Sequence, residues 1–128
     1  MANVMVIEDV IDSANLAKKI LNKFGHEAVI ATNGEEALQL VTSNNIHLIL
    51  LDLGLPDVDG QTLLGMLRRN YGLDEIPIIV CTAWPPETAK KMAEAYGFDG
   101  YISKPYKVEI FMQTLNQFLP EAPSQSPQ

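Results

Sequence analysis

Five short apolar segments, each followed by a segment with helical spacing, constrain the fold of this chain more than any other feature. The apolar segments are rich in Val, Ile and Leu and span residues 4–7, 27–31, 47–51, 77–81 and 100–103. After each of them, apolar residues recur at the spacing of an amphipathic helix. Strand segments that are apolar throughout are typical of parallel sheets covered on both faces. The sequence therefore predicts an α/β fold, (βα)5, with a doubly wound parallel five-stranded sheet.

Length and composition predict a single domain. The chain has 128 residues, of which 47% are hydrophobic, and this is enough to bury a substantial core. We expect the domain to span residues 1–119. The remaining residues, 120–128, are rich in Pro and Ser and lack apolar periodicity, so we expect a disordered tail. The initiator Met and this tail favour a complete single domain.

Charge and cysteine content exclude several function classes. The net charge of -7 disfavours direct binding to nucleic acid or to anionic lipid. No apolar run approaches the roughly 18 residues of a membrane span, and the N-terminus lacks the pattern of a signal peptide. The single cysteine, Cys81, lies in an apolar segment, where we expect a buried and inert thiol. These features predict a cytoplasmic protein without a membrane association.

Polar side chains follow four of the five predicted strands. In a parallel sheet the carboxyl ends of all strands meet at one edge, where ligands bind. The residues expected there are Glu8 and Asp9 after the first strand, Asp52 after the third, Thr82 after the fourth, and Lys104 with Pro105 after the fifth. The second strand is followed by TNGEEA, which is typical of a helix cap with acids in the first turn.

Each of these residues also has an ordinary structural interpretation. Asp52 could start a turn, and Lys104 could be a solvated lysine. Glu8 and Asp9 could cap the first helix, although Asp12 and Ser13 lie nearer its expected start. Capping and turn formation do not explain why the whole set of polar side chains is expected at one edge of the sheet.

The chemistry of the set indicates a metal and phosphate site. Two carboxylates about 4 Å apart repel by roughly 4 kcal/mol at an effective dielectric constant near 20, so a cation must compensate them. Carboxylates with water and phosphate oxygens are the ligands that Mg²⁺ prefers. A carboxylate nucleophile, a divalent cation, a lysine and a hydroxyl also suit phosphoryl transfer. Asp52 would then be the nucleophile that forms an acyl phosphate.

The ordered motifs resemble the receiver domain of two-component response regulators over residues 3–119. They are ED at 8–9, LLDLGLPDVDG at 50–60, CTA at 81–83 and YISKPY at 101–106. The resemblance implies a flavodoxin-like strand order of 2-1-3-4-5. It also implies a phosphorelay function, in which a phosphoryl group passes from a histidine kinase or a histidine phosphotransfer protein to an aspartate. Such a domain catalyses its own phosphorylation and dephosphorylation but does not turn over external substrates.

The resemblance assigns roles to the metal site. It implies that Asp52 is the phosphoacceptor and that Asp9 and Asp52 bind Mg²⁺ directly. The backbone carbonyl of Gly54 would complete the protein ligands, and Glu8 would reach the metal through water. Gly54 is also a departure from the usual pattern, because many relatives carry a larger side chain there.

The resemblance also implies a switch. Lys104 would pair with Asp52 and later with a phosphate oxygen, and Pro105 would follow a cis peptide bond. Thr82 would turn toward the phosphate and open space that Tyr101 could fill. Gly60 is expected to relieve the backbone before the third helix.

Output is expected from the face formed by the fourth helix, the fifth strand and the fifth helix. Candidate contacts for a downstream protein target are Lys90, Glu94 and Tyr101. The expected oligomeric state is a monomer or a weak phosphorylation-dependent dimer. We assign no role to His26 and His47, which are expected at the surface of the opposite edge.

Alternative functions remain open at this point. The chain could be a receiver domain from a larger response regulator or a hybrid kinase. An FMN-binding flavodoxin-like electron carrier is disfavoured, because EDVIDS at 8–13 offers acids where a phosphate would lie. A phosphatase with an aspartate nucleophile normally needs a second Asp at position 54, which is Gly. An unphosphorylated docking module is disfavoured by the complete set of site residues.

Overall fold

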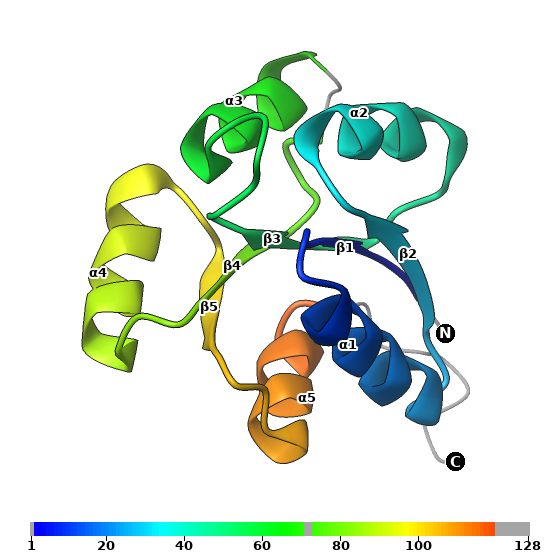
Figure 1. The fold of residues 1–128 in the computed structure, drawn as a ribbon, viewed down its shortest axis with the longest axis vertical. Helices are drawn as coiled ribbons and strands as arrows, with labels where there is room; N and C mark the ends of the chain where they lie inside the picture. The colour runs from blue at the N-terminus through cyan, green and yellow to red at the C-terminus, as the bar shows by residue number, and fades with distance from the viewer. Residues whose placement is uncertain (1, 71–72, 120–128) are drawn as a thin grey trace.

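The computed structural model describes residues 2–70 and 73–119 and shows a parallel five-stranded sheet between two layers of helices (Figure 1). The strands pair in the order β2-β1-β3-β4-β5, and every pair is parallel. This confirms the predicted fold class and strand order. The predicted tail, 120–128, lies outside the described residues. In chain order the elements are β1 Asn3–Ile7, α1 Ile11–Lys23, β2 Glu27–Ala31, α2 Gly34–Ser43, β3 Leu48–Asp52, α3 Gly60–Asn70, β4 Ile78–Thr82, α4 Pro86–Tyr96, β5 Gly100–Ser103 and α5 Val108–Asn116.

The predicted strands agree with the observed ones to within one residue at each end. The third and fourth strands each begin and end one residue later than predicted. Asp52 and Thr82 are therefore the last residues of β3 and β4, rather than the first residues after them. Asp52 pairs in register with Cys81, and Thr82 with Ser103. Because both residues belong to strands, pairing with the neighbouring strand fixes the position of the backbone at Asp52 and at Thr82.

Alternate residues of the central strands enter two separate cores. On one face, side chains such as Ile49 and Leu51 pack against α2, α3 and α4. On the other face, Leu48 and Leu50 pack against α1 and α5. Figure 1 shows the same division, with α1 and α5 on one side of the sheet and the other three helices opposite. Burial on both faces explains why these strands are apolar throughout.

Two helices end at glycines in the left-handed region. Gly25 has φ +85° and Gly97 has φ +87°, and each follows the last turn of a helix, α1 and α4 respectively. Glycine adopts this conformation without the steric cost that a Cβ atom imposes. Each glycine therefore lets the chain leave its helix in a left-handed C-terminal turn.

The two histidines have a structural role that the sequence did not indicate. His26 Nδ1 accepts the N–H of Ala2 at 3.1 Å, and His47 Nδ1 accepts the N–H of Asn3 at 3.0 Å. Both rings are partly buried at the amino edge of the sheet. The expectation of two surface residues without a role was therefore wrong. They bind the first residues of the chain on the two sides of β1.

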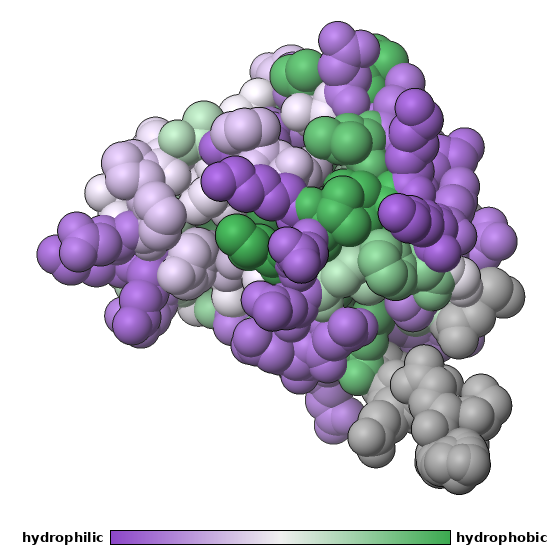
Figure 2. Space-filling view, turned by 90° about the horizontal axis from the view of Figure 1, so that it is seen from below, coloured by the Kyte–Doolittle hydropathy of each residue, from purple (hydrophilic) through white to green (hydrophobic). Residues whose placement is uncertain are grey.

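The face that carries α1 and α5 exposes hydrophobic side chains among hydrophilic ones (Figure 2). Exposed hydrophobic side chains on or next to α1 and α5 are Val10, Ile11, Leu16, Phe24, Val108 and Ile110.

None of the helices in the described part of the chain has the length and apolar character that spanning a membrane requires.

Candidate functional site

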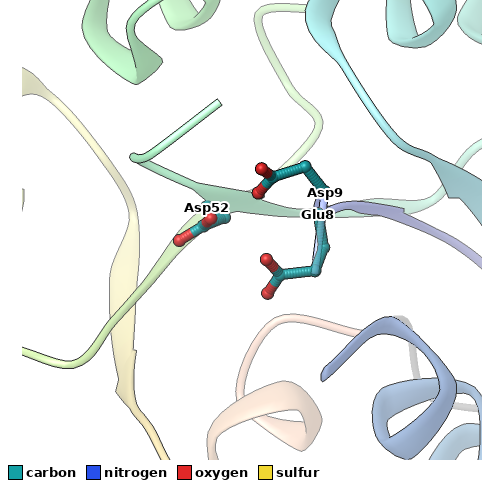
Figure 3. Close-up of side chains that lie close together, drawn as sticks. All are labelled: Glu8, Asp9 and Asp52. Carbon is teal, nitrogen blue, oxygen red and sulfur yellow. The ribbon is translucent and has the colours of Figure 1, made fainter. Parts of the chain in front are cut away.

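Three carboxylates converge at the carboxyl edge of the sheet. Glu8, Asp9 and Asp52 each place an oxygen within 4.8 Å of the others (Figure 3). Glu8 is buried, Asp52 is partly buried and Asp9 is exposed, so the cluster runs from the interior to solvent. The sequence predicted that these three residues would lie together.

Strand pairing explains the convergence. Ile7 lies beside Leu51 in the parallel register of β1 and β3, so the acids that follow them meet at the same level of the sheet. The backbone N–H of Glu8 donates to Ala31 O at 2.8 Å and extends the pairing of β1 with β2 by one residue. Glu8 is thereby held on the central strand although it lies outside β1.

Lys104 supplies the cation that the carboxylates need. Its ammonium group lies 2.5 Å from Glu8 Oε1 and 3.4 Å from Asp52 Oδ1. The backbone N–H of Lys104 donates to Thr82 O at 2.8 Å, which fixes the start of the loop after β5. The Lys104–Pro105 peptide bond is cis, as the resemblance implied. The nearer partner of the lysine is Glu8, and not Asp52 as expected.

The site raises the pKa values of two of its groups. Burial raises the pKa of Glu8 above its ordinary value, although the hydrogen bond from Lys104 opposes this. Burial by itself lowers the pKa of Lys104, but its hydrogen bond to Glu8 and the charge of Asp52 outweigh this and raise it. The lysine is therefore held in its charged form beside the acids.

Glu8 makes a second hydrogen bond just before the start of α1, where the sequence favoured Asp12 and Ser13 as capping residues. Helix α1 begins at Ile11, and its N-cap is Val10 without a capping side chain. Glu8 Oε2 accepts the N–H of Val10 at 3.3 Å. Asp12 lies in the first turn, near the helix start as expected, but the N-cap residue is Val10, so neither Asp12 nor Ser13 caps α1.

Thr82 and Trp84 border a cavity beside Asp52. The cavity has a volume of about 350 Å³, and its walls include Asp52, Gly54, Thr82 and Trp84. Thr82 is buried, and its Oγ1 accepts the backbone N–H of Trp84 at 3.1 Å. Gln61, at the start of α3, also lines the cavity and was not singled out from the sequence. The only signal for it was its position next to Gly60.

Of the two glycines that follow Asp52, Gly60 at the start of α3 allows a close approach. A Cβ atom on Gly60 would lie 2.6 Å from Leu53 Cδ2 and 3.2 Å from Leu53 Cα. Among the described glycines, Gly60 is not one of those with positive φ. Its role is therefore to admit Leu53 rather than to relieve the backbone. Gly54 is exposed, and a Cβ atom there would lie 3.8 Å from Asp52 Oδ2.

The expected output residues lie apart from the carboxylates. Lys90 and Glu94 are exposed on α4, and Tyr101 is partly buried on β5 beside Val80. All three expected residues line a cavity of about 650 Å³ between α4, β5 and α5. Lys104 lines the same cavity and also bonds to the acids, so it connects the two regions.

Cys81 is buried on β4, as predicted. Burial raises the pKa of its thiol to about 12, and a hydrogen bond with Tyr106 opposes this only in part. A thiol in this state is not a nucleophile at neutral pH. The cysteine contributes packing to the core beside α1 and α5.

The donor set fits a hard divalent cation. Asp9 and Asp52 place carboxylate oxygens within 4.8 Å of each other, and the exposed Gly54 follows Asp52 in the chain. Oxygen ligands with an open side toward water suit Mg²⁺, which retains several water ligands in proteins.

The strand order, the acidic cluster and the lysine at the carboxyl edge together define the class of flavodoxin-like receiver folds. Residues 4–116 match the family model described as response regulator receiver domain. The chain belongs to this family, as the motifs of its sequence predicted.

Relatives and solved structures agree with this assignment. The chain is 32% identical over 120 residues to the polar-differentiation response regulator DivK of Brucella anthropi, covering 94% of this chain and 98% of DivK. The chemotaxis response regulator CheY4 of Vibrio cholerae superimposes with a TM-score of 0.84 at 26% identity, covering 93% of this chain and 99% of that one. The receiver domain of the Francisella response regulator 1452 gives a TM-score of 0.81 at 28% identity over 92% and 96%.

Proposed function

We propose that Asp52 accepts a phosphoryl group and that the chain works as a single-domain receiver in a phosphorelay. The observation that carries the proposal is the convergence of Glu8, Asp9 and Asp52 at one edge of the sheet. The ammonium group of Lys104 contacts two of them, Glu8 and Asp52. Asp52 is the member of this cluster that also borders the cavity beside Thr82. A phosphoryl donor can therefore approach its carboxylate from solvent.

The transfer is a displacement at phosphorus. An oxygen of the Asp52 carboxylate attacks the phosphorus of a phosphohistidine, a P–O bond forms, and the P–N bond breaks. The imidazole leaves with the bonding electron pair, and the product is an acyl phosphate on Asp52. Lys104 lies 3.4 Å from Asp52 Oδ1 and can neutralise charge on the incoming group.

Asp9, Asp52 and the carbonyl of Gly54 are the proposed Mg²⁺ ligands, with Glu8 acting through water. When bound, Mg²⁺ supplies positive charge that offsets the carboxylates and the phosphoryl oxygens. Lys104 compensates the charge of the buried Glu8, with which it forms an ion pair.

We propose that the same site switches a protein interaction surface. Phosphorylation adds about 1.5 to 2 negative charges and three strong acceptors beside Thr82. The Thr82 hydroxyl, which accepts the Trp84 N–H, can turn and donate to a phosphoryl oxygen. Tyr101 lies one strand away on β5 and packs against the core that α4 covers. A shift of Thr82 would give the Tyr101 ring room to move inward.

The proposed partners are a histidine kinase or histidine phosphotransfer protein upstream and a protein target downstream. The target would bind the surface that contains Lys90, Glu94 and Tyr101, next to the cavity of about 650 Å³. The match over 98% of DivK supports a receiver domain of about residues 1–119 that works alone. Its proposed place is the cytoplasm, and its proposed state is a monomer or a weak phosphorylation-dependent dimer.

Phosphorylation with acetyl phosphate and Mg²⁺, read by mass spectrometry, tests the phosphoacceptor. The wild-type chain should gain one phosphoryl group, and Asp52→Asn should gain none. The stability of this variant should rise or stay level, because one of the clustered negative charges is removed. Asp74→Asn is the matched control, since Asp74 is an exposed acid before β4. Incorporation at the same rate in Asp52→Asn would overturn the proposal.

Chemical shifts test the output surface. Addition of beryllofluoride and Mg²⁺ should move the amide signals of α4, β5 and the start of α5. Signals of residues in β2 and α2 provide the internal reference. Changes confined to residues outside α4, β5 and α5 would contradict the proposed surface, without affecting the assignment of Asp52.

A further inference from the structure

The β3–α3 loop, residues 53–59, carries Gly54 past the carboxylate cluster. Within the part of the chain that the structure describes, the backbone of residues 54–58 forms no hydrogen bond with other backbone groups. Position 54 therefore depends on side chains for its placement. A flexible loop would place a carbonyl oxygen poorly for metal binding, because Mg²⁺ demands nearly ideal octahedral geometry.

Asp57 attaches this loop to the N-terminus of α2. Its Oδ1 accepts the N–H of Gly34 at 2.9 Å, and its Oδ2 accepts the N–H of Glu35 at 3.0 Å. The two hydrogen bonds, of which that from Gly34 has the larger effect, lower the pKa of the Asp57 carboxyl group. The group is therefore ionised at neutral pH. One carboxylate thus binds two consecutive amides of a helix that lies outside the loop.

Helix α2 has its own N-cap residue, so the contact with Asp57 is made in addition to the capping of the helix. Asn33 is the N-cap of α2, and its Oδ1 accepts the N–H of Glu36 at 2.8 Å. The N–H of Ala37 donates to Asn33 O at 3.1 Å. The side chains of Asn33 and Asp57 together accept the N–H groups of the first three residues of α2, which have no partner within the helix. Of these two hydrogen-bonding residues, Asp57 is the one that links this helix end to the loop.

Packing strengthens the attachment. Gly34 is buried, and a Cβ atom on it would overlap Cγ1 of Val58. The same atom would lie 3.3 Å from Asp57 Oδ1. Val58 is β-branched and has few rotamers with which to avoid such a clash. Pro56 further restricts the loop by fixing its own φ. The loop is thereby held at Asp57 and Val58, close to Gly54 in the chain.

We infer that Asp57 is a positioning residue for the metal site: by binding the amides of Gly34 and Glu35 it fixes the loop that presents the Gly54 carbonyl. This inference rests on the proposed function, because it assumes that the carbonyl is a ligand of Mg²⁺. Asp57 itself touches neither the metal nor the phosphoryl group. Its effect is to hold the carbonyl in place before the metal arrives.

Two variants break the contact from its opposite sides. Asp57→Ala removes both acceptors, and Gly34→Ala forces Val58 away from the helix. Each should weaken Mg²⁺ binding by roughly tenfold, the low end of the effect of residues that orient metal ligands. Asp57→Asn keeps one acceptor oxygen and should restore part of the loss. Binding is measured by titration with Mg²⁺ alone, followed through amide signals near Asp52.

Asn33→Ala is the matched control. It removes a cap from the same end of α2 but leaves the loop contact intact, so it should lower stability without changing the affinity for Mg²⁺. An equal loss of affinity in Asn33→Ala and Asp57→Ala would show that only helix stability matters and would overturn the inference. Unchanged affinity in Asp57→Ala would also overturn it.

A second measurement does not depend on the metal. In the metal-free protein, the backbone order parameter of the Gly54 N–H should fall in Asp57→Ala and in Gly34→Ala but not in Asn33→Ala. An unchanged order parameter in both loop variants would overturn the inference. If the wild-type chain bound no Mg²⁺ and took no phosphoryl group, the proposed function would fail, and the order parameters alone would decide whether Asp57 positions the loop.

Discussion

The ammonium group of Lys104 bonds to Glu8 at 2.5 Å, and Glu8 is the most deeply buried carboxylate of the cluster. The two residues come from opposite ends of the chain and meet because β1 and the segment after β5 reach the same edge of the sheet. An acid in this position is costly without a cation, because burial removes its hydration. The lysine therefore stabilises the fold, and it also supplies positive charge for the proposed phosphoryl transfer.

Replacement of Lys104 by Met should destabilise the protein. The change leaves Glu8 buried beside Asp52 without a cationic partner, and we expect the free energy of unfolding to fall by about 1–3 kcal/mol. Urea denaturation at neutral pH measures this. Lys107→Met is the control, because Lys107 is exposed. Equal stability of the wild-type chain and Lys104→Met would contradict the role of the ion pair.

Emission from Trp84 should report phosphorylation. Trp84 is 47% exposed, and its backbone N–H donates to the Thr82 hydroxyl at the edge of the cavity beside Asp52. If Thr82 turns toward a phosphoryl group, the indole environment changes, since Pro85 restricts the backbone that follows. Beryllofluoride with Mg²⁺ should change the emission of the wild-type chain and not that of Asp52→Asn. Constant emission at full phosphorylation would reject this coupling.

Arg68 should stabilise the edge of the sheet opposite the site. It donates to Leu73 O at 3.0 Å and Ile76 O at 3.1 Å, and its guanidinium lies 2.7 Å from Asp99 Oδ2. Arg68→Ala should lower the free energy of unfolding by about 1–3 kcal/mol, because carbonyl groups lose a charged donor. Phosphorylation of Asp52 should continue. Arg69→Ala, which changes an exposed neighbour, should have a smaller effect on the urea midpoint, and an equal effect would contradict the prediction.

His26 should make stability depend on pH. Burial lowers the pKa of His26, and its neutral Nδ1 accepts the N–H of Ala2. The stability it contributes is present above the unfolded pKa of about 6.5 and is lost as the pH falls toward the lower folded value. His26→Asn keeps an acceptor without titrating in this range. Its free energy of unfolding should therefore fall less on acidification than that of the wild-type chain, and identical curves from urea denaturation would exclude this role.

The sequence by itself determined the elements and the membership of the site. Continuous apolar segments predicted strands buried on both faces, and the structure places each within one residue of its predicted bounds. Parallel strands share a carboxyl edge, so Glu8, Asp52, Thr82 and Lys104 could be grouped without any knowledge of their contacts. The motifs around these residues were also sufficient to indicate the family.

The tertiary structure decided which of these groups bind one another. The preference of Lys104 for Glu8 depends on side-chain positions at the ends of β1 and β5, which local periodicity does not encode. The attachment of Asp57 to Gly34 joins the β3–α3 loop to the first residue of α2, and the N-cap pattern before α2 gave no sign of a second acceptor. Such contacts follow from the packing of segments that are distant in sequence. Local sequence rules describe helices, strands and turns, whereas these hydrogen bonds exist only once the sheet has brought the segments together.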